Sequence, residues 1–568
     1  MKDEEESFIS RLSVFGLRAL RDVGPVWLAL ALLTTIPYAA AALRTPNGYA
    51  FTGVLTAYDD TFTYFAWIRQ GADGCLLMCD LFTSEPQSCE FFLPLWTILG
   101  AIARVTRMPV ALTFHAARLL AGLVLLLVAS ALAASVMKSR TRVRYSLWLY
   151  AMSGGFGWLV YAVKNRSDLF GVHAASGSAD LNMPEAIAFR SVFAQVHFAV
   201  GAALIFASIK LLSSALVEKK PSRALIAGIL VSLLAVVHPY LVVVVWGVAG
   251  VALLTWPWWN DGPKRRRSYY NAAIGVAAAG FTAGTIPGVA YMVYLNRSNE
   301  VLREWLRITD TLSPPPWEYA LGFGIVAMLA VPGFFLMWRT RAPHGRLLLI
   351  WALVQTAMLY APLSFQRRLV EGLQLPLSIA ASVALFWIVR KVFKRPAGAH
   401  YRKLFLVGAV TFGSLTNVGF VIGQMIARGP GPESIDSTDP RRYVPLDLIA
   451  AFDWLRANTD RDAVVFSSYF TGSLAPSMTG LHVFLGHYGQ TIHSDEKGAQ
   501  VTAFYGGTMN DEVARELFME HRVRHVVYGP FEREISDSFA PPSWLKLAYR
   551  HGDVEIFEVT QELGSLAP

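Results

Sequence analysis

Charged residues are scarce in this sequence. Only 16% of its 568 residues are Asp, Glu, Lys or Arg, whereas 54% are hydrophobic and the mean hydropathy is +0.40. Soluble domains carry about 25% charged residues, so the composition excludes an ordinary soluble enzyme and predicts a polytopic membrane protein. The net charge of +9 resides in short loops beside apolar segments. It therefore reflects membrane topology, and we expect no nucleic-acid partner.

Cysteine is also rare. The three present, Cys75, Cys79 and Cys89, fall in one stretch, and we expect one disulfide and one free thiol on an oxidising side of the membrane. A three-thiolate zinc site is the alternative, although no nearby His completes a familiar zinc spacing. The sequence shows no internal repeat and no Gly-rich phosphate loop of the P-loop or dinucleotide type. We expect no cofactor and no divalent metal.

Long apolar segments dominate what is present. A spanning helix needs roughly 20 apolar residues, and eleven segments qualify, at approximately 24–43, 109–137, 145–163, 187–217, 223–237, 240–258, 271–295, 317–338, 346–363, 372–390 and 403–426. Clusters of Lys and Arg fall on alternate connections only. By the positive-inside rule they face the cytoplasm, and they are Lys2/Arg11/Arg18/Arg21, Lys138/Arg140/Arg142/Arg144, Lys219/Lys220/Arg223, Lys264/Arg265/Arg266/Arg267, Arg339/Arg341/Arg346 and Arg390/Lys391/Lys394/Arg395/Arg402/Lys403.

This alternation defines the domain organisation. It requires the short apolar run 91–106 to lie on the outer surface as an interfacial helix. We then expect a cytoplasmic tail at 1–23, a transmembrane domain at 24–426 with a first outer loop at 44–108, and a Gly/Pro-rich linker at 427–440. An extracytoplasmic α/β domain follows at 441–568, with a helix around 448–455, a second at 515–521, and strands at 463–466, 525–528 and 554–557. The predicted location is a bacterial-type inner (plasma) membrane.

The first outer loop holds an acidic pair. Tyr58, Asp59 and Asp60 open an aromatic, amphipathic segment just beyond the first span. Asp at a helix start often only satisfies free backbone N–H groups. The alternative is that one of the two carboxylates is a general base facing a cavity.

An arginine pair on the outer side opposes the positive-inside trend. Gln366, Arg367, Arg368 and Glu371 follow the ninth span. The arginines either reach outward to lipid headgroups or grip the phosphate of a lipid-linked substrate, because a guanidinium matches phosphate oxygens.

Further polar residues stand at a comparable depth in several spans. Intramembrane ionisable residues usually face a cavity, although each alone is more often a packed residue. They are His115, Arg118, Arg190, Gln195, His197 and His238. His487 and His493 of the tail either line the same cavity or are structural.

Together these motifs resemble the GT-C superfamily of membrane glycosyltransferases, such as protein O-mannosyltransferases and aminoarabinose transferases. The acidic pair and its aromatic, Gly-ended helix carry the resemblance, with Phe92 to Gly100 as a second juxtamembrane helix and Ala116 to Leu119 opening the next span. The resemblance implies an α-helical polytopic membrane protein with about eleven GT-C-type transmembrane helices, outer juxtamembrane helices and a C-terminal soluble α/β domain.

The resemblance also implies a reaction. A glycosyltransferase of this type moves a sugar from a polyprenyl-phosphate donor to a glycan, lipid or protein acceptor hydroxyl on the extracytoplasmic face, with inversion and without a metal. Asp59 or Asp60 would be the base and Arg367 or Arg368 the phosphate ligand. The predicted cavity residues are Tyr58, His115, Arg118, Arg190, His197, His238, Gln366 and Glu371. The rival interpretation is a multi-span transporter or lipid flippase, although such proteins tend to show paired repeats, and a third is a non-catalytic membrane scaffold.

Overall fold

The chain forms two compact units. The computed structural model describes residues 2–164, 177–256, 264–308, 310–340, 343–394, 398–426 and 439–560. The helical unit comprises Met1–Pro37, Ala117–Met292 and Thr311–Met425, and the mixed unit comprises Tyr38–Ala116, Val293–Asp310 and Ile426–Pro568. The predicted first outer loop is therefore part of the same unit as the C-terminal domain. Most of the predicted linker lies outside the described residues.

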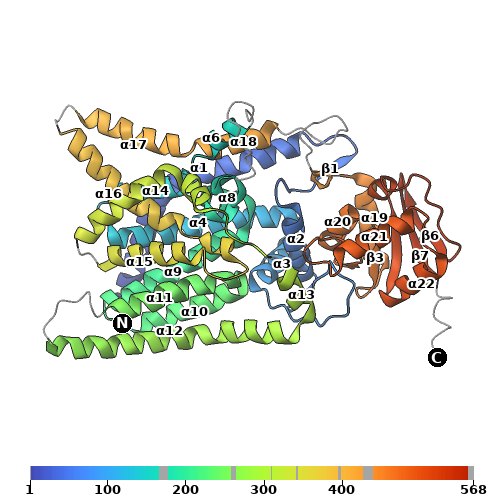
Figure 1. The fold of residues 1–568 in the computed structure, drawn as a ribbon, viewed down its shortest axis with the longest axis horizontal. Helices are drawn as coiled ribbons and strands as arrows, with labels where there is room; N and C mark the ends of the chain where they lie inside the picture. Colours follow the sequence, from blue (N-terminus) through green and yellow to red (C-terminus); the bar gives the residue numbers. More distant parts are fainter. Residues whose placement is uncertain are drawn as a thin grey trace. The chain divides into compact units, whose positions relative to one another are not determined.

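The described part of the helical unit is built of helices (Figure 1). Three of them, α1, α4 and α12, continue into the mixed unit by several residues, and α18 does so by its last residue. Their bounds are α1 (Lys2–Leu43), α4 (Val110–Val136), α5 (Arg140–Met152), α6 (Gly157–Lys164), α7 (Ala179–Asn182), α8 (Ala188–Ala194), α9 (Val196–Val217), α10 (Ser222–Val237), α11 (Val242–Thr255), α12 (Lys264–Ser298), α14 (Pro316–Arg339), α15 (Pro343–Met358), α16 (Gln374–Val392), α17 (Ala399–Gly413) and α18 (Leu415–Ile426), with 3₁₀ turns η2 (Pro184–Ala186), η3 (Pro239–Leu241) and η5 (Gln366–Val370).

Six helical segments in the described ranges are long and apolar enough to cross a membrane, or seven if the bent pair α17 and α18 is one span. The expectation of a multi-pass membrane protein is confirmed, and the count of eleven stays a prediction. Two predicted spans are divided in the structure. Residues 153–156 separate α5 from α6, and Gln195, with extended backbone (φ −143°, ψ 138°), separates α8 from α9. The expected break at Pro239 is confirmed between α10 and α11.

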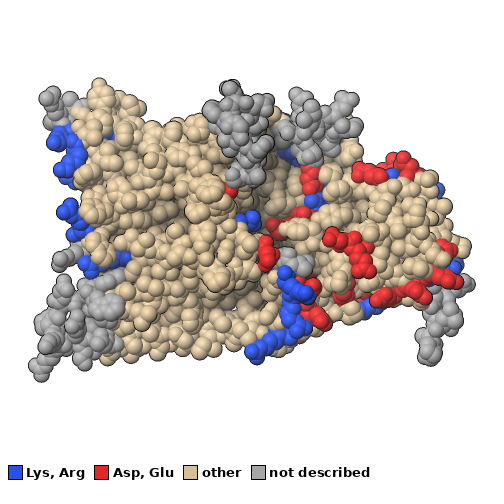
Figure 2. Space-filling model, in the orientation of Figure 1, with Lys and Arg blue, Asp and Glu red and all other residues tan. Residues whose placement is uncertain are grey.

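Basic side chains of the helical unit gather near one of its ends on the face that Figure 2 shows. Figure 2 shows a broad uncharged surface on this unit and basic side chains near the end where α16 and α17 meet. A broad uncharged surface of this kind suits contact with lipid tails.

The mixed unit combines helices with strands. Its elements are β1 (Tyr49–Phe51), α2 (Tyr58–Ala72), α3 (Pro94–Thr106), α13 (Glu300–Ile308), η7 (Pro440–Arg442), β2 (Tyr443–Pro445), α19 (Leu446–Asn458), β3 (Val464–Phe466), α20 (Tyr469–Thr479), β4 (His482–Val483), α21 (Ser494–Tyr505), α22 (Asp511–Glu520), β5 (Val523–Tyr528), α23 (Pro530–Arg533), β6 (Leu545–His551) and β7 (Val554–Val559). The strands and helices predicted for the tail are confirmed within a few residues.

A five-stranded sheet is the centre of the C-terminal domain (Figure 1). Its order is β4-β3-β5-β7-β6, with β3 parallel to β4 and β5, and β7 antiparallel to β5 and β6. Phe466, Phe484, Phe504 and Phe518 form a buried aromatic core beside the sheet. A separate two-stranded sheet pairs β1 with β2 in antiparallel register.

The first outer loop folds onto itself. Helices α2 and α3 pack closely, with the rings of Tyr64 and Trp96 stacked at 4.6 Å. The run 91–106 is confirmed as a short helix, α3, and its place at the membrane surface stays a prediction. Cys79 and Cys89 form a disulfide and Cys75 is a free thiol, as expected.

Candidate functional site

The acidic pair lies in the first turn of α2. Gly53 turns the chain from β1 toward this helix with φ +84°, and a Cβ there would lie 2.8 Å from the Cβ of Ala111. Ala57 precedes the helix in a left-handed conformation, so Asp59 and Asp60 stand beside its free N–H groups without either being the capping residue. The helix dipole favours both carboxylates by about 0.3–1 kcal/mol. It does not distinguish between them.

Two side chains from the C-terminal part of the chain hold Asp59. Its Oδ1 accepts hydrogen bonds from Nη1 of Arg441 and, at 2.8 Å, from the hydroxyl of Tyr469. Arg441 is 4% exposed, and it also donates to Asp439 at 2.6 and 2.8 Å and to the Ser473 hydroxyl at 2.6 Å. Oδ2 of Asp59 accepts no hydrogen bond from any described residue, and 21% of the side chain is exposed to solvent. One carboxylate oxygen is therefore fixed and the other is available.

Charge and burial favour this arrangement. The Cζ of Arg441 lies 5.5 Å from the ring centre of Tyr58 and 5.7 Å from that of Tyr469, within cation–π range. Burial alone would lower the pKa of Arg441, but hydrogen bonds to Asp439 and Asp59 raise it above its ordinary value. Burial raises the pKa of Tyr469, and Asp59 raises it further. Tyr469 thus remains a donor while the charge of Asp59 is met by Arg441.

His487 lies close enough to Asp59 and Asp60 to interact with both electrostatically. Asp60 itself is exposed to solvent. Burial lowers the pKa of His487, and Asp60 and Asp59 oppose that shift. Its Nδ1 accepts the N–H groups of Gly489 and Gln490, and its Nε2 is buried without a hydrogen-bond partner in the described chain.

The predicted arginine pair lies in η5 of the helical unit. The N–H of Arg367 donates to the carbonyl of Thr311 at 2.9 Å, and the amide oxygen of Gln366 accepts from the N–H of Ser313 at 3.1 Å. The Nε of Arg367 is 3.5 Å from Oε1 of buried Glu185, a distance long for a hydrogen bond. With 35% of its side chain exposed, Arg367 makes no side-chain hydrogen bond within the described ranges.

Arg368 belongs to a buried polar cluster of four predicted residues. Its Cζ lies 5.6 Å from the ring of Tyr240, and it interacts electrostatically with His238 and Glu371. Nδ1 of His238 is 3.0 Å from Oε2 of Glu371, and the rings of His238 and His197 are 5.2 Å apart. The Glu371 side chain is fully buried.

The remaining predicted cavity residues contact other parts of the chain. Arg118 donates to the carbonyls of residues 34 and 192, each at 3.1 Å. A nitrogen of His115 lies 2.8 Å from the carbonyl of residue 53. Arg190 lies 3.5 Å from the ring centre of Phe420 and donates to the carbonyl of residue 181. His493 precedes α21 in a left-handed conformation.

Sequence reasoning missed Arg441, Tyr469 and Ser473 around Asp59, and Glu185 and Tyr240 around the arginine pair. The Asp439-Pro440 dipeptide signals the start of η7, but it carries no information on the distant partner of Arg441. In the described part of the chain, no group of three or more His, Cys, Asp or Glu side chains is placed to hold a metal ion.

No family profile and no curated protein sequence matches this chain. Several solved structures resemble it. The oligosaccharyltransferase AglB of Archaeoglobus fulgidus, solved with an inhibitory peptide and a dolichol-phosphate, aligns with a TM-score of 0.53 at 12% identity over 89% of this chain and 69% of its own. ArnT of Cupriavidus metallidurans, bound to undecaprenyl phosphate, aligns with a TM-score of 0.52 at 10% identity, over 95% of this chain and 99% of ArnT.

A third similar structure is the mycobacterial arabinofuranosyltransferase AftD, with a TM-score of 0.54 at 13% identity over 94% of this chain and 40% of AftD. All three neighbours are GT-C glycosyltransferases. The likeness to AglB, ArnT and AftD concerns the course of the backbone along most of this chain, since identities of 10–13% leave few shared side chains. The resemblance stated from the sequence is thereby confirmed for the architecture: the chain has the fold of the GT-C membrane glycosyltransferases.

Proposed function

We propose that this protein is a membrane glycosyltransferase that moves a sugar from a polyprenyl-phosphate donor to an acceptor hydroxyl on the extracytoplasmic face, with inversion at the anomeric carbon. The observation that carries the proposal is the state of Asp59. One of its oxygens is held by Arg441 and Tyr469, while the other takes no hydrogen bond in the described chain. A general base needs this combination of a fixed orientation and an open acceptor atom.

Asp59 is the base in this mechanism, and Asp60 is not. The open Oδ2 accepts the proton of the acceptor hydroxyl as the hydroxyl oxygen attacks the anomeric carbon. Arg441, with Asp439 behind it, orients the carboxylate before the reaction begins. Such proton transfer typically contributes about 10²–10⁴-fold in rate.

The bond from the anomeric carbon to the phosphate oxygen breaks in the same step, and negative charge grows on the departing polyprenyl phosphate. Arg367 is the proposed ligand of that phosphate because its partly exposed side chain makes no hydrogen bond within the described ranges, its contact with Glu185 being an ion pair at 3.5 Å. One well-placed donor contributes about 3–4 kcal/mol to such charge stabilisation. Arg368 is not assigned to the phosphate; it stabilises the η5 turn through its interactions with Tyr240, His238 and Glu371. The solved ArnT and AglB structures, which contain polyprenyl-type phosphates, support the donor class.

The test uses purified full-length protein in proteoliposomes with a panel of farnesyl-phosphate-linked hexoses and pentoses, and bacterial envelope glycolipids as acceptors. We expect one donor to be consumed, with label appearing on the acceptor. Asp59→Asn should lower the rate by at least about 100-fold, because the amide cannot accept the proton, while Asp60→Asn should lose less than about tenfold.

The outcome that overturns the proposal is equally definite. If the wild-type protein releases no polyprenyl phosphate from any donor, or if Asp59→Asn turns over like the wild type, the assignment fails. Uptake of an intact donor lipid without label transfer would favour the transporter interpretation. Circular dichroism and gel filtration of both Asn variants control for misfolding.

A further inference from the structure

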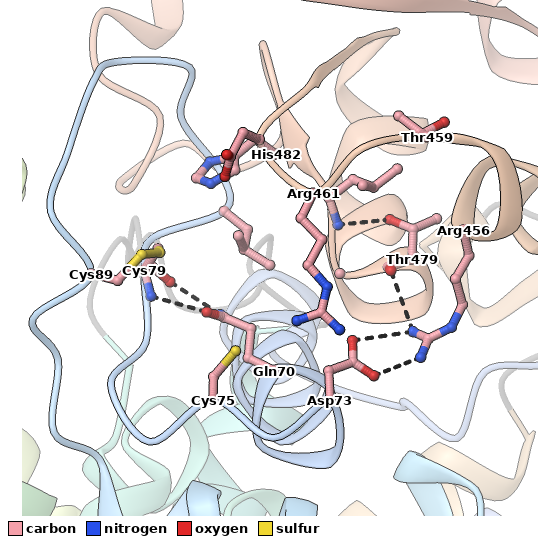
Figure 3. A pocket seen from close by; sticks show the side chains of 14 residues that line it. Gln70, Asp73, Cys75, Cys79, Cys89, Arg456, Thr459, Arg461, Thr479 and His482 are labelled. Carbon is pink, nitrogen blue, oxygen red and sulfur yellow. Dashed lines mark hydrogen bonds and ion pairs between the residues drawn. A yellow bond between two sulfur atoms is a disulfide. The ribbon is translucent and has the colours of Figure 1, made fainter.

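A polar pocket opens in the mixed unit, away from the acidic pair. It has a volume of about 250 Å³. Its walls come from the end of α2 and the cysteine loop, from the end of α19 and the loop after it, and from the turn between α20 and β4 (Figure 3). The lining residues used below are Gln70, Asp73, Cys79, Cys89, Arg456, Arg461 and Asp462.

The pocket is rigid on the side of α2. The Gln70 amide accepts the N–H of Cys79 at 3.0 Å and donates to the carbonyl of the same residue at 3.1 Å, and Cys79 is tied to Cys89 by the disulfide. Nη2 of Arg456 donates to Asp73 at 2.6 Å. A wall that is already ordered lowers the entropic cost of binding, because its side chains need not be immobilised when the ligand arrives.

The lining offers both donors and acceptors at balanced charge. Two arginines, Arg456 and Arg461, line the pocket together with two acids, Asp73 and Asp462, and with two threonines. Figure 3 shows the Arg461 guanidinium reaching into the pocket toward Gln70. Arg461 is exposed to solvent, and its side chain makes no hydrogen bond or ion pair with any described residue.

This chemistry fits a saccharide unit. Sugar hydroxyls donate and accept hydrogen bonds in turn, and a guanidinium and a carboxylate are the strong partners for those two roles. A strongly anionic ligand would be repelled by Asp73 and Asp462. An apolar chain would displace water from the exposed Arg461 guanidinium without offering it a hydrogen-bond acceptor. A neutral sugar meets neither penalty.

The distance from the acidic pair determines the kind of ligand. Gln70 and Asp59 stand on the same helix, so they are about 16 Å apart along its axis at 1.5 Å per residue. One sugar cannot occupy both places. A ligand that reaches from Asp59 to this pocket is a chain of several sugar units.

We propose that the pocket is a binding subsite for an acceptor oligosaccharide, which it holds several sugar units from the hydroxyl that reacts. The inference rests on the proposed glycosyltransferase function. It narrows the acceptor to a glycan chain, and it gives the C-terminal domain a role in selecting acceptors by length.

The test measures binding and turnover separately. The probes are gluco-, manno- and arabino-oligosaccharides, from mono- to hexasaccharide, added to full-length protein in nanodiscs and followed by saturation-transfer NMR. We expect one series to bind more tightly as it lengthens. Arg461→Ala should weaken the longest member about 10- to 100-fold, the range that corresponds to one charge-assisted hydrogen bond, and should leave the shortest member unchanged.

Lys546→Ala is the matched control, because Lys546 is an exposed cation of the same domain outside the pocket. The Asp59→Asn variant should bind oligosaccharides as the wild type does. Binding to the pocket can therefore be tested even if no sugar transfer is detected. Absence of oligosaccharide binding by the wild type, or equal binding by Arg461→Ala, overturns the subsite. If transfer occurs in that case without dependence on acceptor length, the glycosyltransferase proposal survives and the subsite alone fails.

Discussion

A buried ion pair fastens the first outer loop to the C-terminal domain, and its removal is a sharp test of how the mixed unit is held together. Lys497 of α21 is 3% exposed. It donates to Oε1 of Glu85 at 2.7 Å and to the hydroxyl of Ser84 at 2.9 Å. Burial alone would raise the pKa of Glu85, but the Lys497 ammonium outweighs burial and holds that pKa below its usual range. Lys497→Met would leave this carboxylate without its cationic partner, with the Thr83 hydroxyl as its remaining side-chain donor.

The expected cost follows from the burial of the pair. Removing one member of a fully buried ion pair costs about 3–5 kcal/mol. Because 23% of the Glu85 side chain is exposed, water recovers part of this, and we expect about 2–3 kcal/mol for opening of the loop. That corresponds to an opening equilibrium about 30- to 140-fold more favourable. Hydrogen–deuterium exchange of residues 80–91 in nanodisc-embedded full-length protein measures it.

Two controls complete this test. Lys497→Met/Glu85→Met should recover most of the lost protection, since no unpaired charge remains. The folded-state pKa of Glu85 is lowered, so its stabilising contribution is complete above the ordinary glutamate pKa and is lost as the pH falls through the lowered value. The exchange protection of the wild type should therefore decline in acid more than that of the double variant, which has no carboxylate at position 85. Unchanged exchange in Lys497→Met, or a double variant as labile as the single one, would refute the reasoning.

Two further predictions concern the same unit. Burial raises the pKa of Asp80 to about 7, so the cost of ionising it in the fold is complete above that pH, shrinks as the pH falls below it, and vanishes only below the ordinary aspartate pKa. Asp80→Asn should therefore stabilise by about 3–4 kcal/mol near pH ~8 but by only about 1–2 kcal/mol near pH ~5, and an equal change in melting temperature at both would contradict this. A Cβ at Gly100 would lie 2.5 Å from the backbone nitrogen of Ala72, so Gly100→Ala should cost about 1–3 kcal/mol by forcing α2 and α3 apart, while Gly498→Ala, with open space around it, should not destabilise; thermal unfolding that ranks the two alanine variants otherwise would disprove the close packing.

Local patterns predicted the local structure of this protein well. Short runs of apolar, β-branched and aromatic residues predicted β3, β5 and β7, and Pro239 predicted a helix break, because both signals act within a few residues. The break at Gln195 was not predictable in this way. No Gly or Pro stands within five residues of Gln195, so no local signal marks the break.

The acidic pair was recognisable from the sequence, but the choice between its members was not. Asp59 is distinguished from Asp60 by Arg441, which stands 382 residues later in the chain. No periodicity or spacing rule connects positions so far apart. Likewise, the basic clusters predicted which loops share a side of the membrane, whereas the contact of Arg368 with Tyr240 needs the packed fold.

The pairing of β1 with β2 has a consequence for how the protein matures. Residues 49–51 follow the first helix, and their partners 443–445 belong to the last quarter of the chain. Closing so long a loop is entropically costly and slow, and its second strand exists only after most of the chain has been synthesised. The hydrogen bond between Asp59 and Arg441 therefore forms only after most of the chain has been translated. A nascent chain, or one truncated before Arg441, has Asp59 without the side chain that orients it, so its acidic pair is not yet an ordered site.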